Sequence, residues 1–181
     1  MEQQEKKQQG AEIRAFYHSG GTRESMDLGA VLGRRLKGGD CLLLSGPVGA
    51  GKTWLTHGIA EGLEIKTHLQ SPSFTLMFRY ESSLPDRPAL LHFDAYRLSE
   101  PEEWIELGFH EYPGENELAV IEWPERVREV LPKDAIEIKI EPCEDFNERK
   151  MELIFPKGLS SELAEDLKAL GVRFKEESCF A

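Results

Sequence analysis

Residues 46–53 read GPVGAGKT, in full Gly46-Pro47-Val48-Gly49-Ala50-Gly51-Lys52-Thr53. This stretch matches the pattern G-x-x-x-x-G-K-[ST] of a phosphate-binding loop (P-loop), and it lies between a short apolar run and a segment with helical spacing. Its glycines let backbone N–H groups turn inward around a phosphate, and the following helix N-terminus adds partial positive charge. The stretch therefore predicts a P-loop fold and a nucleotide site.

Two side chains at the end of this loop are predicted to do most of its chemistry. Lys52 is expected to reach the β- and γ-phosphates, and Thr53 is expected to place its hydroxyl on the Mg²⁺ that bridges them. We assign all of residues 46–53 to nucleotide binding and Lys52 also to catalysis. Pro47 has no backbone N–H, so the loop has one donor fewer than its length allows.

The elements next to the loop follow from apolar spacing. A helix is predicted from Thr22 to about Lys37, where Gly38-Gly39 ends it. The run Cys41–Leu44 is continuous and apolar, which is typical of a strand buried on both faces. A second helix is predicted to begin at Lys52 and to end at Gly62.

The remaining segments alternate between strand and helix patterns. Strands are predicted at 74–81 and 89–94, and their connection is too short for a helical crossover, so they form an antiparallel hairpin. Further predicted elements are a helix at 101–107, strands at 118–121, 135–140 and 151–155, and a last helix from Ser160 or Ser161 to Gly171. This order predicts an α/β fold of the P-loop NTPase type, with a mixed, mostly parallel sheet flanked by helices.

Two acids stand at the carboxyl ends of predicted strands. Asp94 follows the apolar stretch 90–93, and Glu122 follows 118–121. Parallel strands of an open α/β sheet direct these ends toward the ligand crevice, so both acids are expected to meet the P-loop. Both are candidate catalytic residues and, with Thr53, candidate Mg²⁺ ligands. One would serve the metal and the other the attacking water.

Three features near these acids need interpretation. Two of them allow both a functional and a structural role, and for the third we expect a structural role. The segment 71–75 is rich in hydroxyls and reads either as a loop that senses the γ-phosphate or as a turn that starts a strand. Trp123 would stack on a base or cover the edge of the core. His92 is expected to pack inside its strand, because neither His nor Cys accompanies it at metal-ligand spacing.

Composition limits the class of partner. Thirty-three acids against 22 Lys and Arg give a net charge of −11, which disfavours a direct grip on DNA or RNA phosphates. The three cysteines form no CxxC pair, which favours a reducing compartment, the cytoplasm, and no apolar run is long enough for a membrane span. Residues 1–10 are predicted to be a disordered polar tail, and 11–181 a single domain.

Four motifs taken together resemble one family. GPVGAGKT (46–53), SPSFTL (71–76), HFDAYRL (92–98) and IEWPERV (121–127) are similar, in order and spacing, to the TsaE (YjeE) family of bacterial P-loop ATPases. The resemblance covers about residues 22–141. It implies a Mg²⁺-dependent ATPase that acts beside the subunits TsaD and TsaB in threonylcarbamoyladenosine (t6A) modification of tRNA, with tRNA held mainly by those partners.

The resemblance also implies roles for single residues. Asp94 falls on the acid of the family's HxDxYR motif, and Glu122-Trp123 falls on its Glu-Trp pair, which favours Glu122 as the metal ligand and Asp94 for water or an outer contact. Ser25 takes the place of a threonine that lies near the nucleotide in relatives. The chain departs from the family pattern at Pro47-Val48, where Asp-Leu is usual.

Three other activities use similar motifs. A small-molecule P-loop kinase would need an acceptor pocket and an Arg-bearing lid, and no Arg-rich segment framed by glycines follows Lys52. A GTPase would need an [NT]KxD motif, which the sequence lacks. A nucleotide-gated interaction module with negligible hydrolysis stays open, because P-loop hydrolysis is often slow until a partner assists.

Overall fold

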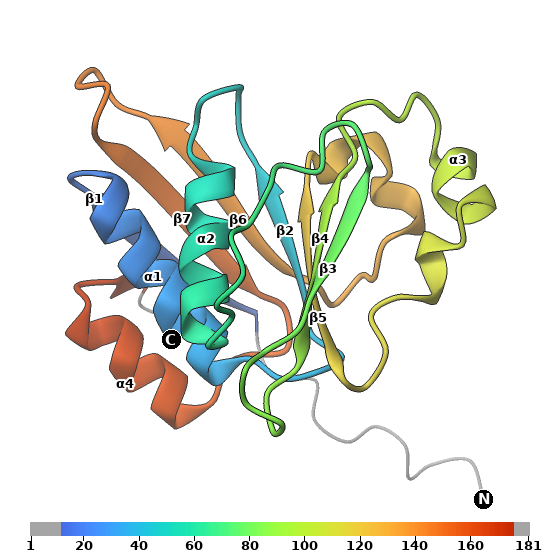
Figure 1. The fold of residues 1–181 in the computed structure, drawn as a ribbon. Coiled ribbons are helices and arrows are strands. Elements are labelled where there is room, and N and C mark those ends of the chain that lie inside the picture. Colours follow the sequence, from blue (N-terminus) through green and yellow to red (C-terminus); the bar gives the residue numbers. More distant parts are fainter. Residues whose placement is uncertain (1–11, 176–181) are drawn as a thin grey trace, which may run out of the picture.

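The computed structural model describes residues 12–175, so the predicted disorder of residues 1–10 lies outside the described part of the chain. One sheet forms the centre of the molecule, and helices lie on both of its faces (Figure 1). None of the helices in the described range has both the length and the apolar character needed to cross a membrane.

Fifteen elements follow one another along the described chain. In order they are β1 (Ile13–Ser19), α1 (Thr22–Arg35), β2 (Cys41–Ser45), α2 (Lys52–Gly62), β3 (Met77–Tyr80), β4 (Ala89–Asp94), α3 (Pro101–Glu106), η1 (Phe109–Glu111), β5 (Glu117–Glu122), η2 (Pro124–Arg126), η3 (Arg128–Val130), β6 (Ile136–Pro142), β7 (Arg149–Phe155), α4 (Ser161–Ala169) and β8 (Arg173–Phe174).

The sheet has the order β3-β4-β5-β2-β6-β7-β1-β8. The central strands β4, β5, β2 and β6 run parallel, and β3 pairs antiparallel with β4 as the predicted hairpin. On the other side β7, β1 and β8 add antiparallel pairings. The predicted parallel centre and hairpin are confirmed, and the antiparallel part of the sheet is larger than predicted.

Two differences from the predicted elements have local causes. Strand β1 was not predicted, because its buried positions include Ala15 and Ser19, whose small side chains give a weak alternating pattern. Strand β3 begins at Met77 rather than at residue 74, because Leu76 N donates to Pro72 O (2.6 Å) and closes a turn first.

The side chains of β2 alternate between two apolar cores. Leu42 and Leu44 pack with α1, α2 and α4 on one face, whereas Cys41 and Leu43 pack with Trp104 and its neighbours on the face covered by α3. Because β2 is buried on both faces and ends at the P-loop, the base of the loop is anchored in the buried centre of the sheet.

Helices α1 and α2 approach each other closely through glycines from both. A Cβ atom at Gly29 would overlap Leu55 O, and one at Gly58 would overlap Met26 O. Only glycine allows backbones to lie at this spacing. The contact fixes α1 against the helix that begins at Lys52, and so fixes the direction in which the P-loop opens.

The buried thiol of Cys41 makes stability depend on alkaline pH. Burial raises the pKa of Cys41 from 9.0 to about 12. The unfolded chain therefore loses this proton above pH 9 while the folded chain keeps it, so the unfolding free energy should fall with rising pH by about 1.4 kcal/mol per unit between pH 10 and 11. Urea unfolding of the wild type and of Cys41→Ala across pH 8–11 measures this pH dependence of the unfolding free energy.

The comparison concerns slopes, because Cys41→Ala also removes packed volume and lowers stability at every pH. Burial raises the pKa of Tyr17 to about 12 as well, but Tyr17 is present in both proteins and its contribution cancels. Equal slopes for the two proteins would contradict the buried, neutral thiol.

Candidate functional site

The P-loop connects the end of β2 to the first residue of α2. Gly49 and Gly51 have positive φ values of 78° and 104°, a backbone region that glycine adopts without strain. A pocket of about 560 Å³ opens above the loop. Its lining residues are Thr22, Val48, Gly49, Ala50, Gly51, Lys52, Thr53, Trp54, Ser71, Ser73, Asp94, Tyr96, Arg97, Glu122, Trp123 and Arg149.

Lys52 is nearly buried, with 5% of its surface exposed. Its Nζ donates to Gly46 O (2.6 Å) and Pro47 O (3.1 Å) and lies 3.8 Å from the centre of the Trp123 ring. Burial lowers the pKa of Lys52, while the charge of Glu122 opposes the shift. The ammonium is therefore held over the loop by carbonyl oxygens and a π face, ready for an anionic ligand.

Glu122 links the P-loop to the sheet. Its carboxylate accepts from Thr53 Oγ1 (3.1 Å to Oε1) and lies 2.9 Å from His92 Nε2, although only 4% of Glu122 is exposed. Because a carboxylate only accepts hydrogen bonds, we assign a hydrogen to His92 Nε2. Within residues 12–175, Nδ1 of this buried histidine has no partner, which fits its acceptor form. The prediction that His92 packs inside its strand is confirmed.

Asp94 lies beside Glu122 at the edge of the sheet. The two residues are direct partners in the parallel pairing of β4 with β5, and 4% of Asp94 is exposed. Its Oδ2 accepts from Ser73 Oγ (2.6 Å), and its Oδ1 accepts from Tyr96 N (2.9 Å). The two acids therefore converge at the P-loop as expected, and they engage different partners.

The segment 71–75 forms the predicted turn and also reaches the pocket. The bond from Leu76 N to Pro72 O makes it a turn before β3, and Ser71 and Ser73 nevertheless line the pocket. Ser71 Oγ and Ser73 Oγ are 2.8 Å apart, and Ser73 continues the chain of contacts to Asp94.

Three predicted nucleotide contacts lie off the pocket lining. Ser25 is 3% exposed, its Oγ lies 2.8 Å from Ser19 Oγ, and Thr22 at the helix start lines the pocket instead. The hydroxyl of Ser25 is thus used to join α1 to β1. Gly46 and Pro47 form the base of the loop, where their carbonyls accept from Lys52, rather than its lining.

Arg149 is a pocket residue that the sequence motifs did not indicate. Its Nε donates to Ala50 O (2.7 Å) and its Nη2 to Gly49 O (3.2 Å). The arginine lies 99 residues beyond Ala50, at the start of β7. A strand that folds back beside β6 brings it to the loop, so local sequence patterns contain no signal for the contact.

Two charged or aromatic groups near the acids were also outside the predicted set. Tyr96 lines the pocket and packs against Trp123 with ring centroids 4.9 Å apart, and Arg97 stacks on Phe74 at 4.1 Å. Tyr96 and Arg97 belong to the HFDAYRL motif. That motif could therefore have identified them as pocket residues from the sequence. Trp123, in the left-handed region (φ 60°), turns its ring toward Lys52 rather than into the core.

Comparisons with known proteins agree with this geometry. The sequence profile of the family described as "Threonylcarbamoyl adenosine biosynthesis protein TsaE" matches residues 20–151. The chain is similar to the tRNA threonylcarbamoyladenosine biosynthesis protein TsaE of Treponema pallidum, with 38% identity over 119 residues, which cover 66% of this chain and 85% of the relative. It is also similar to TsaE of Streptomyces coelicolor, with 39% identity over 115 residues, 64% of this chain and 77% of the relative.

A solved structure shares the same architecture. The crystal structure of Bacillus subtilis YdiB matches with a TM-score of 0.64 and 26% sequence identity, covering 88% of this chain and 95% of YdiB. The fold is therefore a P-loop nucleotide-binding fold, as predicted. Together with the matched profile, the two relatives and the convergence of four motifs on one pocket, this shows that the chain belongs to the TsaE family of threonylcarbamoyladenosine biosynthesis proteins.

Proposed function

We propose that this chain is the Mg²⁺-dependent, ATP-binding and ATP-hydrolysing subunit of the t6A machinery, acting with TsaD and TsaB. One observation carries the nucleotide part of the proposal. The P-loop hydroxyl of Thr53 meets the buried carboxylate of Glu122 at 3.1 Å, beside the ammonium of Lys52. A cation-binding pair and a phosphate-binding cation are thus placed side by side, as a metal-nucleotide complex requires.

The donor set fits Mg²⁺. A hydroxyl and a carboxylate are hard oxygen donors, and Mg²⁺ typically takes one or two such protein ligands while phosphate oxygens and water complete its shell. Thr53 and Glu122 would hold the ion. When bound there, Mg²⁺ would neutralise negative charge on the β- and γ-phosphate oxygens.

The remaining polar groups of the pocket take complementary roles. Lys52 would turn from the carbonyls of Gly46 and Pro47 to the β- and γ-phosphates. Asp94, already bonded to Ser73, would orient the attacking water or an outer-shell contact of the metal. Trp123 supports Lys52 through its ring face and belongs to the nucleotide pocket through its position in the lining.

The contacts of the pocket arginines support slow hydrolysis by the isolated chain. Both arginines of the pocket lining are engaged, Arg97 on the Phe74 ring and Arg149 on loop carbonyls. A transition state for phosphoryl transfer gains most from an arginine free to reach it. A partner that supplies or frees such a group would accelerate the reaction.

The mouth of the pocket also has the apolar character of a contact surface. Val48 (79% exposed), Trp54 (50%) and Tyr96 (47%) line the pocket, and Phe74 (84%) adjoins it. Grouped large apolar side chains in water mark interaction sites. The net charge of −11 further favours protein partners over direct tRNA contact. We place the TsaB–TsaD contact at this mouth, in the cytoplasm where tRNA is modified.

The test measures ATP hydrolysis and t6A formation with purified components. We expect slow turnover by this chain alone, stimulation of about 10³-fold by TsaB–TsaD, the lower end of what a supplied arginine contributes, and t6A formation only with all three proteins. Phe74→Ser should lose stimulation but keep basal turnover, whereas Phe146→Ser, exposed on the β6–β7 connection, is the matched control. Fast turnover without partners would contradict the proposal, and transfer of the γ-phosphate to an acceptor would show a kinase.

A further inference from the structure

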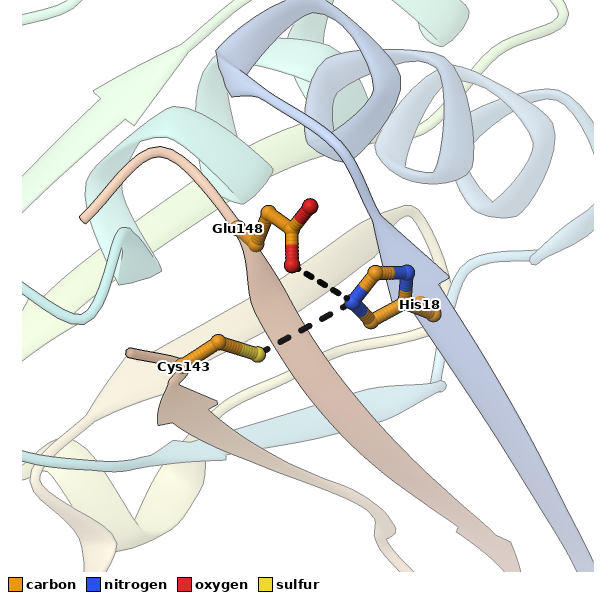
Figure 2. A group of neighbouring side chains, drawn as sticks. All are labelled: His18, Cys143 and Glu148. Atoms are coloured by element: carbon orange, nitrogen blue, oxygen red, sulfur yellow. Dashed lines mark hydrogen bonds and ion pairs between the residues drawn. The ribbon is translucent and has the colours of Figure 1, made fainter. Parts of the chain in front are cut away.

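Three potential metal ligands from distant parts of the chain meet beside the P-loop (Figure 2). His18 lies near the end of β1, Cys143 directly follows β6, and Glu148 directly precedes β7. His18 Nε2 is 3.2 Å from Glu148 Oε2 and 3.9 Å from Cys143 Sγ. The three ligand atoms all lie within 4.8 Å of one another.

The backbone holds these residues in place. His18 pairs with Lys150 across β1 and β7, and Cys143 N donates to Glu148 O (3.2 Å) as the last rung between β6 and β7. Glu148 N in turn donates to Asp145 O (3.0 Å) and closes the connection between the two strands. The ligands therefore project from rigid sheet ends, and rigid elements give a metal site its precision.

The chemistry of the set matches zinc. Imidazole, thiolate and carboxylate are the three protein ligand types of Zn²⁺, with bonds of about 2.0–2.3 Å, so tetrahedral ligands lie roughly 3.3–3.6 Å apart. The observed separations need only small side-chain rotations to reach that spacing. We propose that His18, Cys143 and Glu148 bind Zn²⁺, with the fourth position open to water or to a partner's side chain.

The position of this zinc site connects it to the nucleotide pocket. Arg149 follows Glu148 in the chain and donates to Glu148 O (2.8 Å), Ala50 O (2.7 Å) and Gly49 O (3.2 Å). Fixing Glu148 with a metal restrains the residue that braces the P-loop. Zinc binding should therefore stiffen residues 46–51 as well as residues 143–148.

Cobalt substitution tests the ligands without using nucleotide. The full chain, stripped with a chelator and titrated with Co²⁺, should develop thiolate-to-cobalt charge-transfer absorption together with the intense visible bands of a tetrahedral ion, and Zn²⁺ should displace both. Cys143→Ser should abolish the charge-transfer band. His18→Ala and Glu148→Gln should each weaken Zn²⁺ binding, in competition titrations, by more than the roughly 10- to 100-fold that loss of an outer-shell partner causes.

Matched substitutions separate this site from other thiols and acids of the chain. Cys41→Ala and Glu144→Gln remove another described thiol and another carboxylate outside the three ligands, and both variants should keep the Co²⁺ spectrum. Absence of the charge-transfer band from the wild type would overturn the zinc site, and so would its persistence in Cys143→Ser. Loss of ATP binding would leave this result untouched, so failure of the proposed function is distinguishable.

Hydrogen exchange tests the connection to the P-loop. Zn²⁺ should slow amide exchange in peptides covering 143–148 and 46–51 of the wild type. Arg149→Ala should keep the Co²⁺ spectrum and the slowing at 143–148, and should lose the slowing at 46–51. Unchanged exchange at 46–51 in the zinc-loaded wild type would overturn the connection, whereas the Co²⁺ spectrum decides the metal site itself.

Discussion

Replacing Lys52 with Met is expected to weaken binding of Mg²⁺–ATP by about a hundredfold and to lower the hydrolysis rate by at least as much, the range for losing one charge-assisted contact to a developing phosphate charge. Met keeps much of the apolar stem that packs near the Trp123 ring while removing the ammonium. Isothermal titration with ATP and Mg²⁺ measures the affinity, and phosphate release with TsaB–TsaD measures the rate.

The size of this effect follows from the position of the ammonium. Lys52 is nearly buried and its charge is balanced by carbonyl dipoles and by the neighbouring Glu122, so a triphosphate gains an already desolvated cation. Lys66→Met is the control, because Lys66 is exposed and pairs with Glu64 at the surface. ATP affinity in Lys52→Met within threefold of the wild type would show that the loop does not bind phosphate as we propose.

The parallel centre of the fold was predictable because its determinants are local. Continuous apolar runs such as Cys41–Leu44 identify strands buried on both faces, and the P-loop identifies which strand precedes the nucleotide. Strand β1 escaped prediction because its small buried side chains give a weak alternating pattern and because its partner strand lies far along the chain. Its stability comes from pairing with β7 near the other end of the chain, and that pairing leaves little trace in the residues of β1 themselves.

The residues of the candidate site also fall into a predictable group and an unpredictable group. Lys52, Thr53, Asp94 and Glu122 stand at positions where a strand or loop ends, so topology alone brings them together. Arg149 and the zinc ligands meet through antiparallel pairing of distant segments, which no motif spacing encodes. Ser25, which was predicted from the family resemblance, bonds Ser19 in the structure, and that contact between α1 and β1 is also not encoded by motif spacing.

Glu122→Gln is expected to lower partner-stimulated hydrolysis by about 10²- to 10³-fold while ATP binding without metal changes little. Thr53 and His92 both contact Oε1 of Glu122, so the amide oxygen can still accept from them, but the neutral group loses its attraction for Mg²⁺. The dependence of the rate on Mg²⁺ concentration should shift to higher values. Phosphate release at varied Mg²⁺, with metal-free ATP titration in parallel, separates metal binding from nucleotide binding.

Glu129→Gln serves as the control, because Glu129 is exposed on η3 and lies outside the pocket lining. Asp94→Asn then distinguishes the two acids. Because Asp94 bonds Ser73 rather than Thr53, its loss should reduce the rate without shifting the Mg²⁺ dependence. If Asp94→Asn shifted the Mg²⁺ dependence and Glu122→Gln did not, the metal would belong to Asp94, and the contact between Thr53 and Glu122 would serve only to anchor the loop to the sheet.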